Sequence, residues 1–151
     1  MEKGFSFEQR SSPETQKEKE KISLLRSLQE IEGATVSENT RESYSYKLRF
    51  ENEKSFTSVY ILFYDEENGA DISITSITTL PKQTKDKVEE VRGMGGGSRA
   101  VQKIIEWGRA NGFTKIMAAQ VQESAKDFWT KNGFVYDERE DNYSEEWIYR
   151  G

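Results

Sequence analysis

Alternating apolar and polar residues in the middle of the chain predict strands. From Tyr44 to Glu51 every second residue is apolar, which is typical of a strand with one buried face. The run from Phe56 to Tyr64 is almost continuously apolar or β-branched and predicts a more central strand. Asn68-Gly69 then predicts a tight turn into a returning strand over residues 71–80. The apolar positions of the first of these strands are Tyr44, Tyr46, Leu48 and Phe50.

The apolar residues change parity within the strand 71–80. Ile72 and Ile74 share one face, whereas Ile77 falls on the other. One extra residue near Thr75 or Ser76, a β-bulge, explains this change of phase. A strand whose two faces are both covered by helices explains it equally well. Residues 4–9 also alternate and predict a short strand at the start of the chain.

A helix is predicted from Ser12-Pro13, an N-cap followed by a first-turn proline, to about Glu32. Gly33 ends it. Its first half is rich in Lys and Glu and has no apolar face, so we expect residues 1–20 to be partly disordered. The apolar stripe of the second half consists of Ile22, Leu24, Leu25, Leu28 and Ile31.

The last third of the chain alternates helix and strand signals. The best-defined helix is predicted from Arg99 to Asn111, because Val101, Ile104 and Ile105 have helical spacing. Together these patterns predict an α/β fold in which helices cover a mixed sheet. The further predicted elements are a strand at Lys115–Val121, a short helix at Glu123–Lys131 ended by Gly133, and a hairpin of Phe134–Asp137 with Trp147–Tyr149.

Composition narrows the range of functions. The 151 residues fit one domain, and 34% hydrophobic residues are enough for a globular core. The chain has no Cys and no His, which excludes disulfides, zinc clusters, thiol nucleophiles and Ser-His triads, and we expect no metal. No apolar run is long enough to span a membrane, and no signal-peptide pattern starts the chain, so we expect a cytoplasmic protein. The net charge of −5 disfavours nucleic acid as a partner.

The segment with the clearest chemical meaning is the glycine run Arg92-Gly-Met-Gly-Gly-Gly-Ser98, directly before the predicted helix. Glycines let successive backbone N–H groups turn toward one point, and the helix adds its unpaired N-terminal donors and its positive dipole end. This junction predicts a site for a phosphorylated ligand.

The glycine run alone does not identify that ligand. A nucleotide P-loop requires a Lys that is absent here. The dinucleotide fingerprint Gly93-x-Gly95-x-x-Ser98 must follow directly on a buried strand, and the charged residues 85–90 do not form one. A flexible glycine loop without a ligand is the default for an isolated glycine cluster.

Two motifs together are more specific. Arg92-x-x-Gly95-x-Gly97 is followed, after a helix and a strand, by Phe128-Trp129-x-Lys131-x-Gly133-Phe134. This pair resembles the pyrophosphate loop and the aromatic helix end of the GNAT superfamily of N-acyltransferases, over about residues 70–137. The resemblance implies a GNAT-like mixed, mostly antiparallel central sheet flanked by helices.

The resemblance also implies acetyl-CoA as the co-substrate. Backbone N–H groups from Arg92 through Ser98 would hold its pyrophosphate, and the strand ending at Leu80 would pair with the pantetheine amides. Lys82, Lys85, Lys87 and Arg99 are candidates for the adenosine phosphate. The implied cofactor-binding residues are Ile77, Thr79, Leu80, Arg92, Gly93, Met94, Gly95, Gly96, Gly97, Ser98, Gln122 and Trp129.

Acyl transfer to an amine requires a neutral amine, a donor to the oxyanion and a proton source for the leaving thiolate. By resemblance, a backbone N–H at the bulge, at Thr75, is the oxyanion donor and Asp71 the base. A solvent-exposed turn aspartate is the simpler interpretation of Asp71. The family's proton-donating Tyr is replaced by Trp129, so water, Tyr136 or Tyr143, or the attacking amine itself, would supply the proton.

The leading interpretation is an enzyme that acetylates a primary amine of an acceptor that the sequence does not identify. A catalytically silent GNAT-like module that binds acyl-CoA or a protein is the alternative, and an interaction domain without ligand is the third. The acidic residues near the end of the chain can attract a cationic acceptor or form a soluble face. A homodimer is left open. These acidic residues are Asp137, Glu138, Glu140, Asp141, Glu145 and Glu146.

Overall fold

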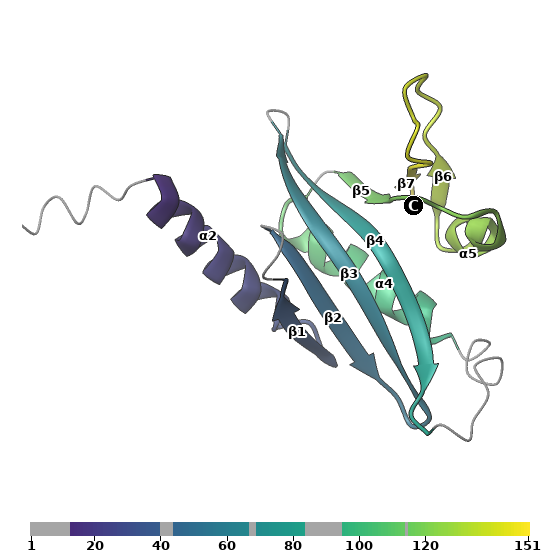
Figure 1. Cartoon of the computed structure of the whole chain (residues 1–151), viewed down its shortest axis with the longest axis horizontal. Helices are drawn as coiled ribbons and strands as arrows, with labels where there is room; N and C mark the ends of the chain where they lie inside the picture. The colour runs from purple at the N-terminus through teal and green to yellow at the C-terminus, as the bar shows by residue number, and fades with distance from the viewer. Residues whose placement is uncertain (1–12, 40–43, 67–68, 84–94, 114) are drawn as a thin grey trace, which may run out of the picture.

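The computed structural model describes residues 13–39, 44–66, 69–83, 95–113 and 115–151. Its centre is a seven-stranded sheet with the strand order β1-β2-β3-β4-β5-β7-β6 (Figure 1). In chain order the elements are α2 (Pro13–Leu28), β1 (Ala34–Glu38), β2 (Ser45–Glu51), β3 (Ser55–Glu66), β4 (Gly69–Pro81), α4 (Gly96–Ala110), β5 (Lys115–Ala118), the 3₁₀ turn η1 (Glu123–Ala125), α5 (Lys126–Lys131), β6 (Phe134–Tyr136) and β7 (Trp147–Tyr149).

The sheet is mixed but mostly antiparallel, as the resemblance implied. Every neighbouring pair of described strands is antiparallel except β4 and β5. These two parallel strands are joined by the crossover through α4, which lies behind the sheet in Figure 1. The predicted fold class, a mixed and mostly antiparallel sheet flanked by helices, is therefore confirmed.

One face of α4 packs against the sheet because its apolar residues recur at helical spacing. Gly108 is needed at this contact: a Cβ there would lie 2.8 Å from Cδ1 of Ile72. The helix therefore approaches β4 more closely than any larger residue would allow. The buried residues of α4 are Ala100, Val101, Ile104, Ile105, Trp107 and Gly108.

An aromatic cluster joins α2 to the rest of the fold. The Trp107 indole N–H donates to the backbone oxygen of Ser27 at 3.2 Å, and the Tyr46 hydroxyl donates to that of Lys21 at 3.3 Å. Phe63 lies edge-on to both rings, with centroid distances of 5.7 Å to Tyr46 and 5.8 Å to Trp107. The predicted inward face of the 44–51 strand is confirmed, since Tyr46 and Leu48 are fully buried.

Several boundaries differ from the sequence-based expectations. The first helix ends at Leu28, not at about Glu32, and Ile22 is 51% exposed although it was assigned to the apolar stripe. The strand predicted to reach Val121 ends at Ala118, because the backbone turns at Gln120, whose φ is +52°. The helix predicted from Arg99 begins earlier, at Gly96, within the glycine run.

The sequence analysis did not predict β1, whose five residues pair with β2 at the edge of the sheet. The short helix assigned to 123–131 is a 3₁₀ turn followed by α5, and the hairpin of β6 with β7 is confirmed. The predicted strand at 4–9 and the residue Asn68 of the predicted turn lie outside the described residues. No helix in the part of the chain that the structure describes is long and apolar enough to cross a membrane.

Candidate functional site

The described part of the glycine run forms the N-terminus of α4. Gly95 is the N-cap residue with φ +77°, a left-handed conformation that glycine adopts without strain. The first helical hydrogen bond runs from the N–H of Arg99 to the oxygen of Gly95 at 3.0 Å. The N–H groups of Gly96, Gly97 and Ser98 therefore have no acceptor within the helix, and no acidic residue lies in the first turn. Arg92, Gly93 and Met94 lie outside the described residues.

Gly96 and Gly97 are also required by packing. A Cβ on Gly96 would lie 2.9 Å from the hydroxyl of Thr57, and one on Gly97 would lie 3.2 Å from the Phe128 ring. The Thr57 hydroxyl is 2.9 Å from that of Thr79 on the neighbouring strand. The start of α4 thus rests directly on the ends of β3 and β4, with its free N–H groups at their edge.

Asn132 connects α5 to the glycine run. Its side-chain amide donates to the Ser98 hydroxyl at 3.1 Å and to the Phe128 oxygen at 2.8 Å. Gln102 on α4 donates to the Asn132 side-chain oxygen at 3.2 Å. Asn132 is buried, so these bonds form away from water. In the second motif Asn132 occupies a variable position. Its role follows from its burial at the end of α5, which the sequence pattern does not reveal.

The change of phase in β4 is a β-bulge, which confirms that interpretation. Ile74 pairs with Ile61 and Ser76 with Tyr60, which leaves Thr75 as the extra residue. After the bulge, Ile77 again faces α4, since its Cδ1 would lie 3.6 Å from a Cβ on Gly97. The Thr75 side chain is exposed, and its hydroxyl donates to the Tyr60 backbone oxygen at 3.3 Å.

The bulge lies where β4 and β5 separate. Their parallel pairing ends at Ile74 and Ala118, followed by one bond from the N–H of Ala119 to the Ile74 oxygen at 3.0 Å. β4 continues to Pro81, and among the described strands none pairs with it on this side. The edge of β4 from Thr75 onward is therefore available to an extended ligand that reaches the N-terminus of α4.

The remaining cofactor-binding candidates lie around this edge. Ile77 and Thr79 are half-buried toward α4, whereas Leu80 is 40% exposed and Gln122 is exposed just before η1. Trp129 is only 5% exposed and packs edge-on against Phe134, with a centroid distance of 4.9 Å. Phe128, not Trp129, is the aromatic ring that contacts Gly97.

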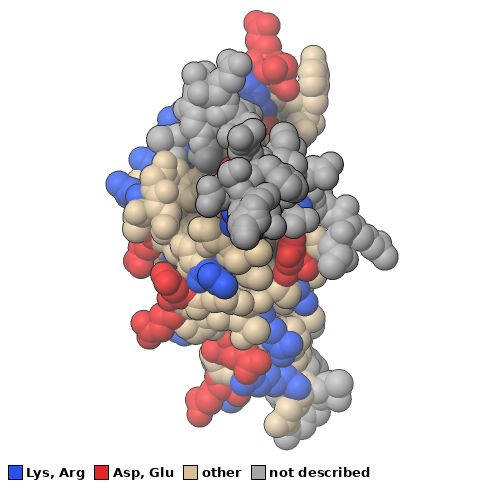
Figure 2. All heavy atoms as spheres, turned by 90° about the vertical axis from the view of Figure 1, so that its left-hand side faces the viewer, with Lys and Arg blue, Asp and Glu red and all other residues tan. Residues whose placement is uncertain are grey.

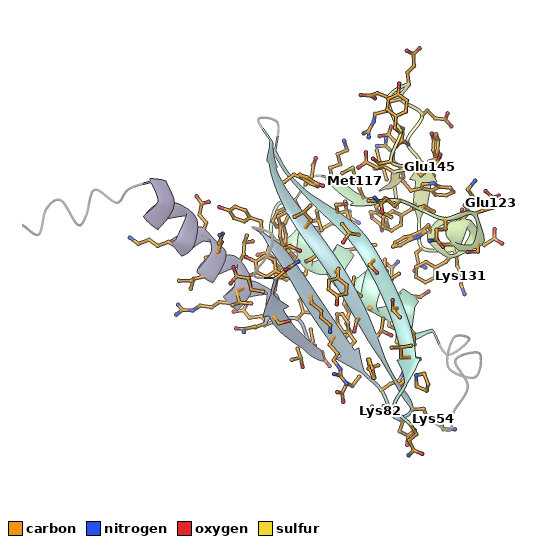
Figure 3. The ribbon with its side chains drawn as sticks, viewed as in Figure 1. Lys54, Lys82, Met117, Glu123, Lys131 and Glu145 are labelled. Carbon is orange, nitrogen blue, oxygen red and sulfur yellow. The ribbon has the colours of Figure 1, made fainter. Side chains whose placement is uncertain are left out.

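Two basic candidates are described. Lys82 lies beside Lys54 at the end of the β3–β4 pair (Figure 3), and its ammonium is 3.4 Å from the Glu51 carboxylate. Arg99 is exposed in the first turns of α4. Lys85 and Lys87 lie outside the described residues. Glu123 lies beside α5 and Glu145 near β7 (Figure 3).

Asp71 is buried, so the interpretation as a solvent-exposed turn residue is wrong. It is only 5% exposed and is aligned with Tyr64 on β3 and Lys115 on β5. Ser73 is fully buried on the same face of β4, opposite α4, and its hydroxyl has no hydrogen-bond partner. A buried hydroxyl without a partner is unusual and requires an explanation. No local pattern distinguishes Ser73, because serine alternates normally with isoleucine in this strand.

The two tyrosines considered as proton donors differ in their surroundings. Tyr136 is half-buried on β6 and packs edge-on against Trp147, with a centroid distance of 6.3 Å. Tyr143 is 89% exposed. Of these two tyrosines, Tyr136 is the one whose side chain is fixed by packing in the hairpin that flanks β5.

Arg139 pairs with three carboxylates of the acidic segment after β6, which stays acidic overall. Its guanidinium bonds to Glu146, to Asp137 at 2.8 Å and to Asp141 at 3.2 Å, and the hydrogen bond to Glu146 is the main reason that its pKa is raised. The base of the segment is tied to the end of β5, because Gln120 and Val121 donate from their N–H groups to the oxygens of Ser144 and Glu145 at 2.8 and 3.1 Å. The described residues contain no group of three carboxylates placed to hold a metal ion.

Comparison with known proteins agrees with the two motifs. Residues 87–134 match the model of the acetyltransferase (GNAT) family, and this segment contains both motifs. The resemblance to that superfamily is therefore confirmed. A search of curated proteins finds no match.

Solved structures show partial likeness. The KacTA–DNA complex has a TM-score of 0.45 and 17% identity, and AtaTR bound with AcCoA has 0.45 and 14%. Each similarity covers 70% of this chain and 65% of the other, so this chain spans less than two thirds of those proteins. The NatC complex bound to Gag peptide and CoA has a TM-score of 0.45 and 14% identity, and covers 70% of this chain and 68% of that one.

Proposed function

Starting from the GNAT segment at residues 87–134, we propose that this chain transfers an acetyl group from acetyl-CoA to a primary amine by direct attack. The partners in this proposal are acyl-CoA and an amine-bearing acceptor. The observation that supports it most directly is the hydrogen bond from Asn132 to Ser98, which brings the two motifs together. They lie beside the free edge of β4, which begins at the bulge.

The residues present fit acetyl-CoA. The free N–H groups of Gly96, Gly97 and Ser98, together with Gly95 and residues 92–94, hold the pyrophosphate at the positive end of α4. The free edge of β4, which includes Ile77, Thr79 and Leu80, pairs with the pantetheine amides. Gln122 and Trp129 are the remaining proposed acetyl-CoA-binding residues, and Phe128 packs beside the glycines.

The chemical step uses no His or Cys. The neutral amine attacks the thioester carbonyl, a C–N bond forms, and the carbonyl oxygen becomes an oxyanion that the N–H at the Thr75 bulge stabilises. When the oxyanion collapses, the C–S bond breaks and the thiolate leaves. The nitrogen loses one proton and the sulfur gains one, so the products are an amide and the free thiol of CoA.

Asp71 and Ser73 have a role in preparing the amine. Most primary amines are protonated at neutral pH and must lose a proton before attack. The buried carboxylate of Asp71 accepts that proton, directly or through a water, and the unpaired Ser73 hydroxyl lies between Asp71 and the bulge along β4. Ser73 is thus a positioning residue for the amine or for that water.

Tyr136 is the proposed donor to the thiolate, because Trp129 cannot act as an acid. Its place in the hairpin tied to β5 supports this role. The attacking amine can serve as the proton source instead. A variant Tyr136→Phe separates these routes: a loss of turnover with unchanged acetyl-CoA affinity supports Tyr136, and unchanged turnover supports the amine.

The test of the proposal has two parts. Isothermal titration with acetyl-CoA should show one site per chain, and a panel of primary amines should release CoA thiol above the background rate of hydrolysis. If acetyl-CoA fails to bind at millimolar concentration, the proposal is wrong.

A catalytically silent module that binds acyl-CoA is the second candidate. The burial of Trp129 at the position of the family's proton-donating Tyr favours it. This candidate predicts acetyl-CoA binding without thiol release for every amine in the panel.

A further inference from the structure

A cavity lies between α2 and the ends of β2 and β3, and the proposed acetyl transfer does not use it. Its volume is about 390 Å³, within the range of small-molecule sites. The glycine run contacts Thr57 near one end of β3, whereas this cavity includes Phe63, six residues further along the strand, or roughly 20 Å. The lining residues are Glu20, Ser23, Leu24, Tyr44, Phe63, Tyr64 and Phe113.

The walls of the cavity are aromatic and held in place by the core. Phe63 is only 8% exposed and lies 5.2 Å from the Phe113 ring, centroid to centroid. Phe113 in turn stacks on Trp107 at 5.4 Å. The rings that line the cavity are therefore fixed from behind, and an aromatic ring attracts a cation that lies over its face.

The rim adds a carboxylate. The Tyr44 hydroxyl donates to the Glu20 carboxylate at 3.2 Å, which anchors Glu20 beside the aromatic walls. The Lys21 ammonium lies 5.6 Å from the centre of the Tyr44 ring, so one wall already attracts a cation of the protein itself. Tyr44 has a φ of +59°, which residues other than glycine rarely adopt, and such strain is often found at ligand sites.

The Glu20 carboxylate is not part of a large acidic surface. On the side of the molecule that carries α2, acidic and basic side chains are interspersed and form no large area of one sign (Figure 2). A ligand is therefore selected by Glu20 and the rings, not by the field of the whole surface.

We propose that the cavity lined by Glu20, Tyr44, Phe63 and Phe113 binds a small organic cation with an alkylated ammonium group. The cation takes the carboxylate as its counter-ion and the ring faces as its walls. An anion is repelled by Glu20, and a neutral apolar molecule gains no attraction from the carboxylate. This site is independent of acetyl transfer.

The test compares choline with 3,3-dimethylbutan-1-ol, which has the same shape but a carbon in place of the charged nitrogen. Titration calorimetry of the full chain, without acetyl-CoA, should show choline binding and the neutral analogue binding about tenfold more weakly. Equal binding of the two would overturn the proposal, because the cavity would then select apolar shape only.

Variants locate the site. Glu20→Gln keeps the shape and should weaken choline binding about fivefold to tenfold, whereas Glu30→Gln, an exposed glutamate of the same segment, should leave it unchanged. Leu24→Trp fills the cavity and should abolish binding while the thermal unfolding midpoint stays within a few degrees of the parent protein. Unchanged binding in Leu24→Trp would place the site elsewhere.

Binding of neither compound at tens of millimolar also overturns the proposal. Sedimentation velocity then identifies the other occupant: a dimer that Leu24→Trp dissociates would make this cavity an interface between two copies of the chain.

Discussion

Asn132 donates a hydrogen bond from its side-chain amide to the hydroxyl of Ser98, at 3.1 Å across 34 positions of sequence. This bond joins the last helix to the glycine run, so the proposed pyrophosphate site depends on a residue that does not itself face the ligand. The position of the free N–H groups at the start of α4 is therefore set from two sides, by Thr57 on β3 and by Asn132 on α5.

Asn132→Ala should destabilise the fold by about 1–3 kcal/mol, because it leaves buried partners without hydrogen bonds. It should also weaken acetyl-CoA binding several-fold, because Ser98 loses its support. Chemical denaturation and calorimetry measure the two effects.

Asn111→Ala is the matched control. Asn111 makes the same type of bond, from its side-chain amide to the oxygen four residues earlier at 2.8 Å, but at the far end of α4. It should lower stability and leave acetyl-CoA affinity unchanged. Equal losses of affinity in both variants would mean that Asn132 acts only through global stability.

Gly96→Ala should weaken acetyl-CoA binding about tenfold or more, because its Cβ would collide with the Thr57 hydroxyl at 2.9 Å and displace the start of α4. Gly112→Ala is the comparison: φ is +83° there and no heavy atom lies within 4 Å of the added Cβ, so it strains the backbone without touching the site. Its expected effect is on stability alone. Normal acetyl-CoA affinity in Gly96→Ala would refute the role of this contact.

Ser73→Ala should raise the free energy of unfolding by about 1 kcal/mol, since it removes a buried hydroxyl that has no partner. It should also lower kcat/KM and shift the pH–rate profile, because Asp71 loses the group that positions the amine or water. A more stable protein with full activity and an unchanged pH profile would show that Ser73 has no catalytic role.

Ser45→Ala is the control for Ser73→Ala. Ser45 is also buried, but its hydroxyl accepts a hydrogen bond from the Asn39 amide at 3.5 Å. Its removal should lower stability slightly and leave turnover unchanged.

Alkaline pH should destabilise the fold through Tyr46. Burial is the main reason that its pKa rises from 10.0 to about 12. Above pH 10 the unfolded chain releases this proton while the folded chain keeps it, so stability is complete below pH 10 and is lost as pH rises toward 12. Denaturation at several pH values measures the loss, and tyrosinate absorbance follows the titration. Tyr46→Phe should have a flatter profile in this range, and an identical profile would contradict the assignment.

The sequence predicted the central hairpin, the bulge and the two motifs because each has a local pattern. The parity change from Ile74 to Ile77 was compatible with an extra residue or with a strand covered on both faces, and the pairing with β3 shows Thr75 to be the extra residue. The edge strand β1 was not predicted, since only Ala34 and Val36 of its residues are apolar and a short edge strand depends on β2 for its hydrogen bonds.

The burial of Asp71 and Ser73 also depended on tertiary structure. A short polar side chain after a turn is normally exposed, whereas in the fold β4 lies between β3 and β5 and both side chains are buried. The Asn132 contact arises in the same way, from the packing of α5 on α4.

The most direct test of acetyl transfer is thiol release from acetyl-CoA, measured with a mixed panel of primary amines and confirmed by mass spectrometry of the acetylated product. The account predicts release that depends on both enzyme and amine, and that falls about tenfold or more in Gly96→Ala. Binding of acetyl-CoA with no thiol release above background for any amine would contradict it and identify the chain as a silent acyl-CoA-binding module.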